Sequence, residues 1–200
     1  MDKMRCLVAL LSVLLLLLGA PPARSASLEF EFPALERLIS TGLLTQGGRL
    51  FLNGNDPADC SHAFVQQPRI DAVERRLRIT FLFSGRQAVS VGGRCVGPSG
   101  TFDIQVSGVP AFVGGEIVLD QPAVETSSRA QPLFQLVAPL IESQLAARLR
   151  FPLKKVLGLA AYQLSTTHAV SMAFGNLVIP KIEVRERSLR IQFDSDVVIK

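Results

Sequence analysis

PRIDAVERRLRITF, residues 68–81, decides the fold, because the same pattern returns as PKIEVRERSLRIQF at residues 180–193. The two stretches align without a gap at an offset of 112 residues, and eight of the 14 positions are identical. In each copy, apolar residues alternate with polar ones on both sides of a charged stretch, which is typical of a β-hairpin. Both copies therefore predict a hairpin, with turns at Glu74–Arg76 and Glu186–Ser188.

The repeat has two interpretations. Any hairpin with a charged turn can show such a pattern, so the likeness can arise from local structure alone. Alternatively, one unit is duplicated and stands at each end of one curved sheet. Arg69 matches Lys181 and Asp71 matches Glu183 in charge, which both interpretations accommodate. The sequence leaves both open.

Residues 68–124 continue as strand after strand. Residues 77–83 and 101–108 place apolar side chains at every second position, which indicates a sheet with one dry and one wet face. Gly114 and Gly115 interrupt a further alternating stretch and predict a tight turn, since glycine adopts positive φ. These patterns predict an antiparallel sheet that is covered on one side.

A long amphipathic helix is predicted to cover the dry face. From Pro132 to Leu149, apolar residues recur at steps of three and four, over roughly five turns. Pro139 should bend this helix or mark its true start, and Pro152 should end it. The other expected elements are a strand, a short helix that Gly42 stops, a strand and a closing strand pair, at residues 27–32, 33–41, 49–56, 177–179 and 182–198.

The first 25 residues have the layout of a secretory signal peptide: basic residues, an apolar run from Leu7 to Leu18, and small residues before the cleavage site. The run is shorter than the roughly 20 residues that a membrane-spanning helix needs. We expect cleavage after Ser25 and a periplasmic or secreted single domain at residues 26–200. Cys6 precedes the apolar run instead of following it, so a lipoprotein anchor is not expected.

Charge argues against nucleic acid as a partner. The whole chain carries a net charge of +4, and the first 25 residues hold three of the basic residues and one of the acidic ones. Without them the net charge falls to +2, far from the dense basic surface that phosphate binding requires. The sequence does not indicate the oligomeric state.

Cys60 and Cys95 form an even pair in a chain with an export signal. Disulfides persist in exported compartments, so we expect these two cysteines to be bonded. The alternative is a pair of free buried thiols.

Catalytic patterns are missing from the sequence. His62 and His168 are its two histidines, and neither a zinc-binding spacing nor a nucleophile elbow is present. We therefore predict no enzyme, no metal and no cofactor. A group of arginines on alternating strands predicts either a solvated face or contact with anionic lipid headgroups; they are Arg75, Arg76, Arg78, Arg185, Arg187 and Arg190.

Two stretches carry a resemblance to a known family. They are the helix pattern and the hairpin that precedes it, with matches at Leu136, Pro139, Leu140, Leu145, Leu149 and Pro152 and at Pro110, Phe112, Gly115, Ile117 and Leu119. With the strand periods, these positions resemble the YceB-like family of bacterial envelope proteins, a domain of unknown function. Its fold is similar to the tubular lipid-binding (TULIP) proteins of the bactericidal/permeability-increasing type. The chain departs from that family in lacking the lipoprotein cysteine and in holding Cys60 and Cys95.

The resemblance implies an α+β fold in which a long curved antiparallel β-sheet wraps around one long amphipathic helix, with a short N-terminal helix. It also implies a cleft for a lipid or another apolar ligand, and a role in envelope lipid handling, with peripheral membrane contact. The alternative function is a non-catalytic structural or protein-interaction module of the envelope. The expected ligand-lining residues are Ile79, Phe81, Leu133, Leu136, Val137, Leu140, Ile141, Leu145, Ile191 and Phe193.

Overall fold

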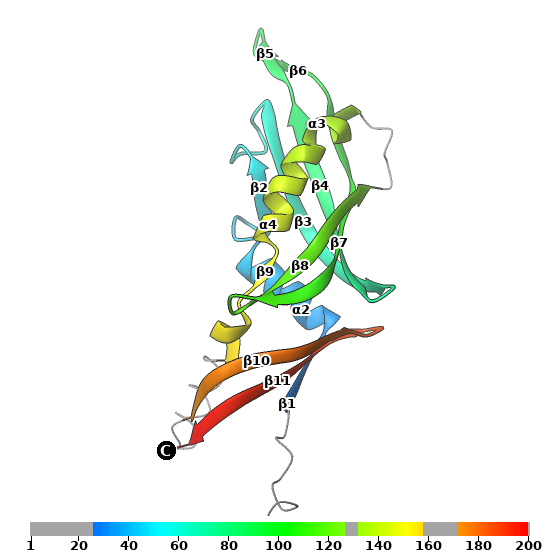
Figure 1. Cartoon of the computed structure of the whole chain (residues 1–200). Coiled ribbons are helices and arrows are strands. Elements are labelled where there is room, and N and C mark those ends of the chain that lie inside the picture. The colour runs from blue at the N-terminus through cyan, green and yellow to red at the C-terminus, as the bar shows by residue number, and fades with distance from the viewer. Residues whose placement is uncertain (1–25, 127–131, 158–171, 200) are drawn as a thin grey trace, which may run out of the picture.

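The computed structural model describes residues 26–126, 132–157 and 172–199. The predicted signal peptide therefore lies outside the described residues. The described chain is mostly β, with a larger sheet, a smaller sheet below it and a two-stranded arm at the far end (Figure 1).

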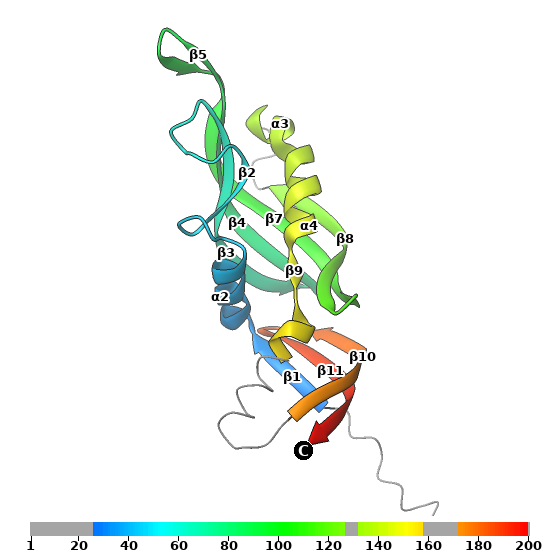
Figure 2. The same ribbon diagram turned by 90° about the vertical axis from the view of Figure 1, so that its left-hand side faces the viewer.

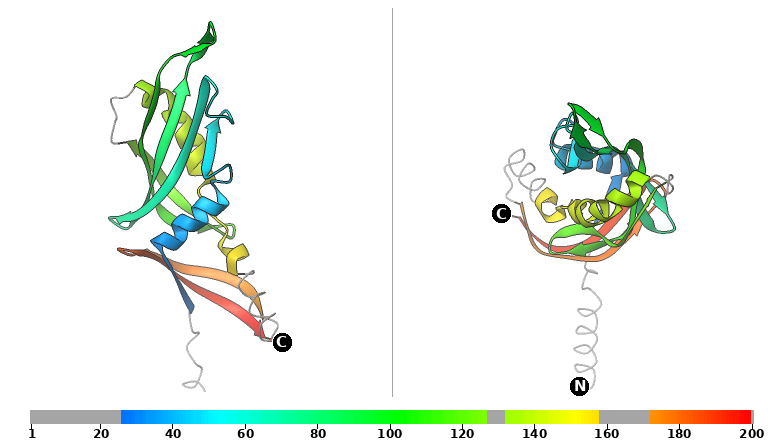
Figure 3. Two further views of the ribbon diagram at one scale, coloured as in Figure 1. Left: turned by 180° about the vertical axis from the view of Figure 1, so that it is seen from behind. Right: turned by 90° about the horizontal axis from the view of Figure 1, so that it is seen from above.

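The larger sheet is antiparallel, has the strand order β2-β3-β4-β7-β8-β9, and curls into a half-barrel (Figure 3). Its long strands are β3 (Ser61–Val73), β4 (Arg76–Gln87), β7 (Ser99–Val113) and β8 (Glu116–Thr126). The short edge strands are β2 (Arg49–Asn53) and β9 (Arg150–Phe151).

Strand β4 shows why one face of this sheet is dry. Every second side chain from Leu77 to Phe83 is buried, and the residues between them are partly exposed. Ile104 and Val106 on β7 continue the same face and are fully buried. The predicted alternation and the Gly-Gly turn between β7 and β8 are confirmed.

The smaller sheet has the antiparallel order β1-β11-β10. Its strands are β1 (Ala26–Glu31), β10 (Met172–Val184) and β11 (Ser188–Ile199). Leu189 and Ile191 belong to the same buried cluster as the dry face of β4, so the two sheets share a core. The backbone amide of Phe32 also donates to the carbonyl of Arg187, at 3.0 Å, and fastens the β10–β11 turn to the chain that follows β1.

The repeated stretches form two hairpins with the same register. In the β3–β4 hairpin Ile70 pairs with Ile79, and in the β10–β11 hairpin Ile182 pairs with Ile191. The second pair lies at the same positions of the repeat as the first. The turns fall at residues 74–75 and 186–187, inside the two predicted stretches. The hairpins lie in different sheets, so the second interpretation of the repeat, with both copies in one curved sheet, is wrong.

Each hairpin also carries a bulge at the equivalent place. The β3–β4 register shifts between Gln66 and Arg69, and the β10–β11 register shifts between Val178 and Lys181. Each shift encloses the proline that opens the repeat, Pro68 or Pro180. Because proline has no amide hydrogen to donate to the ladder, a bulge is where a strand accommodates it.

The predicted α+β fold, with a sheet wrapped around one long amphipathic helix, is wrong. The protein is mostly β and its helices are short. After Pro132 the helical stretch divides into α3 (Pro132–Leu140), a π-helical segment (Ile141–Leu145) and α4 (Ala146–Arg148). These pieces lie across the open side of the half-barrel (Figure 2).

Proline and strand pairing explain the short helices. Pro139 lies inside α3, where it cannot donate the regular helical hydrogen bond, and the π-helical segment follows at once. Arg150 then leaves the helix and pairs with Val118 as β9. The periodic stripe was a correct guide to burial for most of its residues, but not for exposed Leu136 and partly buried Leu140. Its buried residues are Leu133, Val137, Ile141, Leu145 and Leu149.

Helix α2 (Phe32–Gly42) confirms the short N-terminal helix. Pro33 occupies its first turn, where the missing amide hydrogen is harmless. The helix covers the part of β3 that β2 does not reach, since β2 pairs with β3 only up to Gln66. The Glu36 carboxylate accepts a hydrogen bond from the backbone amide of Ile70, at 2.7 Å, and satisfies that open strand edge.

Candidate functional site

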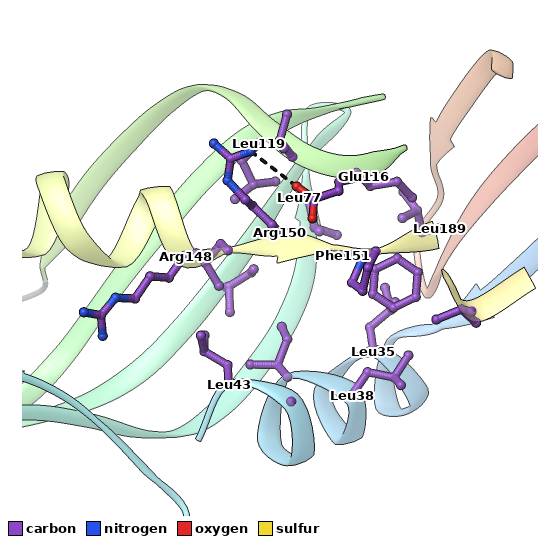
Figure 4. A pocket seen from close by; sticks show the side chains of 18 of the residues that line it. Leu35, Leu38, Leu43, Leu77, Glu116, Leu119, Arg148, Arg150, Phe151 and Leu189 are labelled. Atoms are coloured by element: carbon purple, nitrogen blue, oxygen red, sulfur yellow. Dashed lines mark hydrogen bonds and ion pairs between the residues drawn. The ribbon is translucent and has the colours of Figure 1, made fainter. Parts of the chain in front are cut away.

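A pocket of about 480 Å³ lies where α2, the half-barrel, β9 and the start of β11 meet (Figure 4). This volume falls within the roughly 300–1,000 Å³ of small-molecule sites. Its apolar lining consists of Leu35, Leu38, Ile39, Leu43, Ile70, Leu77, Ile79, Ile117, Val118, Leu119, Leu149, Phe151, Pro152, Val156 and Leu189. Its polar side chains are those of Thr41, Glu116, Arg148, Arg150 and Lys155.

Helix α2 supplies one wall. Leu35 and Leu38 are one helical turn apart and face the pocket, and Leu43 follows just after the helix ends (Figure 4). Leu35 is buried, whereas Leu38 and Leu43 are only partly buried. The last two side chains therefore keep apolar surface open to an occupant.

The opposite wall combines the two repeated hairpins. Leu77 near the start of β4 and Leu189 near the start of β11 occupy equivalent positions of the repeat, and both line the pocket. Leu119 of β8 lies beside them (Figure 4). The pocket thus forms where the two copies converge, and the pattern within either copy alone gives no sign of it.

The polar rim is cationic. Arg150 forms an ion pair with Glu116 at 3.3 Å, so one positive charge of the rim is neutralised (Figure 4). The Arg148 guanidinium donates to the carbonyl of Phe51 at 3.3 Å and keeps its charge. Lys155 forms no ion pair within the described part of the chain. The rim therefore carries an excess of positive charge beside an apolar interior.

The predicted lining residues lie mainly in the core, away from this pocket. Of the ten, the pocket wall includes Ile79. Leu136 is 60% exposed on α3, and Leu140 is partly buried. The others are buried residues of the two sheets and the helical stretch: Phe81, Leu133, Val137, Ile141, Leu145, Ile191 and Phe193.

Sequence reasoning missed α2 as a wall of the site. The signal is present in the sequence, because Leu35, Leu38 and Ile39 are spaced as one apolar face of a short helix. What the sequence does not show is that β3 runs past the end of β2 and needs this helix as cover.

The predicted disulfide between Cys60 and Cys95 is confirmed, with the two Cα atoms 5.2 Å apart. Nearby, His62 is buried, its Nδ1 lies 2.8 Å from the carbonyl oxygen of Asp59, and its ring stacks on Phe64. These contacts give His62 a structural place in the fold. His168 lies outside the described residues.

The described residues contain no group of His, Cys, Asp or Glu side chains that could hold a metal ion. In the same ranges, no helix has the length and apolarity needed to cross a membrane.

Several of the strand arginines bind within the protein. Arg78 is hydrogen-bonded to Asp71, and this bond raises the pKa of the guanidinium further above its ordinary value. Arg185 forms ion pairs with Glu29 and Glu183. Arg76 donates to two backbone carbonyls. These three are engaged by the fold itself, which leaves fewer of them for a lipid headgroup.

No protein-family model, curated protein or solved structure matches the chain. The likeness to the YceB-like family therefore stays a prediction.

Proposed function

We propose that this is an exported protein that binds a small amphiphile, with its apolar chain in the pocket between α2 and the two repeated hairpins. The observation that carries the proposal is the combination of size and lining. The pocket has about 480 Å³, aliphatic walls and a few polar groups confined to its rim. Such a composition is that of ligand sites in general.

The rim suggests the chemistry of the head group. Arg148 and Lys155 lie at the pocket and have no carboxylate partner among the described residues, whereas Arg150 is ion-paired with Glu116. A carboxylate or phosphate head would meet these cations while the chain replaces water on Leu38 and Leu43. A fatty acid or a lysophospholipid has this form.

Export rests on two observations. The Cys60–Cys95 disulfide is typical of proteins outside the reducing cytosol. The sequence of residues 1–25 has the layout of a signal peptide. Handling of lipids in a bacterial envelope, as the YceB-like resemblance implies, is the setting that we propose.

A pair of identical substitutions tests the site. Leu38→Gln places an amide in the pocket wall and keeps a good helix former on α2. Leu136→Gln makes the same change on exposed α3, outside the pocket. In titrations with a fluorescent fatty acid, we expect Leu38→Gln to weaken binding roughly tenfold through lost apolar contact. Leu136→Gln should bind like the wild type.

Two outcomes would overturn the proposal. One is a wild-type protein that takes up no fluorescent fatty acid or lysophospholipid. The other is equal weakening by the two substitutions, with unchanged circular dichroism. In either case the structural or protein-interaction role would replace it.

A further inference from the structure

The β5–β6 arm, residues 88–97, projects beyond the half-barrel at the end opposite to the smaller sheet (Figures 1 and 2). It consists of β5 (Val89–Val91) and β6 (Arg94–Val96), joined by Gly92 and Gly93. Both glycines have positive φ, as a two-residue hairpin turn requires. The arm pairs only with itself in the described chain.

One face of the arm is apolar and has no cover. Val89 pairs with Val96, and Val91 pairs with Arg94. Directly paired residues and residues two apart share a face, so these four side chains lie together, and Cys95 lies on the opposite face. Val89, Val91 and Val96 are 66%, 58% and 60% exposed. The described part of the chain thus leaves this valine face open.

The base of the arm is held firmly. The disulfide joins Cys95 to Cys60, just before β3. The amide of Ala88 donates to the carbonyl of Cys60, and the amide of Gln87 donates to that of Pro98, both at 2.9 Å. An arm fixed in this way loses little further conformational entropy when its valine face is buried by a partner.

Charge identifies the kind of partner. Arg94, paired with Val91 beside the turn, is the one charged residue of the arm. Asp56 and Asp59 precede Cys60, which the disulfide joins to Cys95, so the acidic residues lie on the side of the base and not at the tip. Val178 on β10 offers a contrast, because this exposed valine pairs with Asp194. The arm therefore combines exposed valines with positive charge, which is the combination that attracts a segment to an anionic lipid surface.

We propose that the valine face of the β5–β6 arm docks the protein on an anionic membrane surface. A bilayer accepts three small apolar side chains at its interface, whereas a stable protein partner generally needs about 800 Å² from each side. The arm lies far from the pocket, so this contact is independent of ligand binding. This contact would bring the protein to a membrane without the strand arginines, several of which are bound to partners within the protein.

A single tryptophan reports the contact, because the chain has no tryptophan of its own. Val91→Trp places the probe on the arm, and Val178→Trp places it on β10, where the side chain is 57% exposed and pairs with Asp194. With vesicles of phosphatidylglycerol and phosphatidylcholine, we expect the emission of Val91→Trp to shift to the blue and to be quenched by brominated acyl chains. The emission of Val178→Trp should not change.

Vesicle flotation tests the unlabelled protein. Replacing Val89 and Val91 with serine should abolish flotation with the anionic vesicles, and Arg94→Gln should weaken it roughly fivefold through the lost charge. Leu38→Gln should float like the wild type, which separates this contact from the pocket. Equal emission changes at both tryptophan sites would overturn the proposal. Equal flotation of the wild type and the double serine variant would also overturn it, and would point to a protein partner for the arm.

Discussion

The β3–β4 and β10–β11 hairpins begin from nearly the same sequence and end in different surroundings. Both keep the register and the bulge that the repeat encodes. β4 then pairs with the 15-residue strand β7, whereas β11 pairs with the six-residue strand β1. Local sequence therefore specifies a hairpin, and the neighbours decide how deeply it is buried.

The largest expected difference lies at the phenylalanine that ends each copy. Phe81 is 0% exposed within the shared core, and Phe193 is 9% exposed on β11 of the smaller sheet. Phe81→Ala should lower the free energy of unfolding by about 3–5 kcal/mol, and Phe193→Ala by roughly half as much. Denaturant titrations of the two variants measure the difference. Equal losses would show that the smaller sheet is packed as tightly as the half-barrel.

The turns should respond to glycine in opposite directions. Arg75 has a φ of 67°, a conformation that costs a non-glycine residue roughly 1 kcal/mol, whereas Arg187 has no positive φ. Arg75→Gly should therefore raise the thermal midpoint, and Arg187→Gly should leave it unchanged or lower it slightly. Scanning calorimetry checks the sign of each change. A lower midpoint for Arg75→Gly would contradict the two-residue turn.

The smallest expected difference concerns acid. The hydrogen bond from Lys181, with help from the charges of Arg185 and Arg190, lowers the pKa of Glu183. A lowered carboxyl pKa contributes stability above the unfolded-state value, and this contribution is lost as pH falls through the folded-state value. Glu183→Gln should therefore flatten the acid limb of the stability curve slightly, as melts from neutral to acidic pH would show.

Asp71, which occupies the position of Glu183 in the first hairpin, is hydrogen-bonded by Arg78 instead of by a residue at the position of Lys181. The Arg78 pKa is raised by Asp71, so this contribution is complete below the ordinary arginine pKa and is lost only in strong alkali. Arg78→Gln should therefore lower the thermal midpoint slightly at neutral pH, where the contribution of the pair is present. A midpoint equal to that of the wild type would contradict a stabilising bond.

The sequence predicted what depends on short-range patterns. Alternation identified the dry face of β4 and β7, and paired glycines identified the β7–β8 turn. Two cysteines and a predicted export signal led to the prediction of the disulfide, which is confirmed. Each of these features depends on neighbours in the chain or on an even count, which a single sequence displays directly.

The sequence failed where long-range pairing decides. The apolar stripe after Pro132 runs on without a break, and only the pairing of β9 with β8 shows why the helix stops. The pocket likewise needs Leu38, Leu77 and Leu189, which lie far apart in the chain and meet only in the folded protein. The residues of this stripe were predicted to line a ligand cleft, yet most of them are buried in the core.

Native mass spectrometry of the protein, purified without detergent, tests the ligand proposal most directly. The account predicts one bound amphiphile per chain, released by organic extraction, with occupancy reduced in Leu38→Gln and unchanged in Leu136→Gln. A bare protein mass that stays unadducted after incubation with fatty acids and lysophospholipids would contradict it.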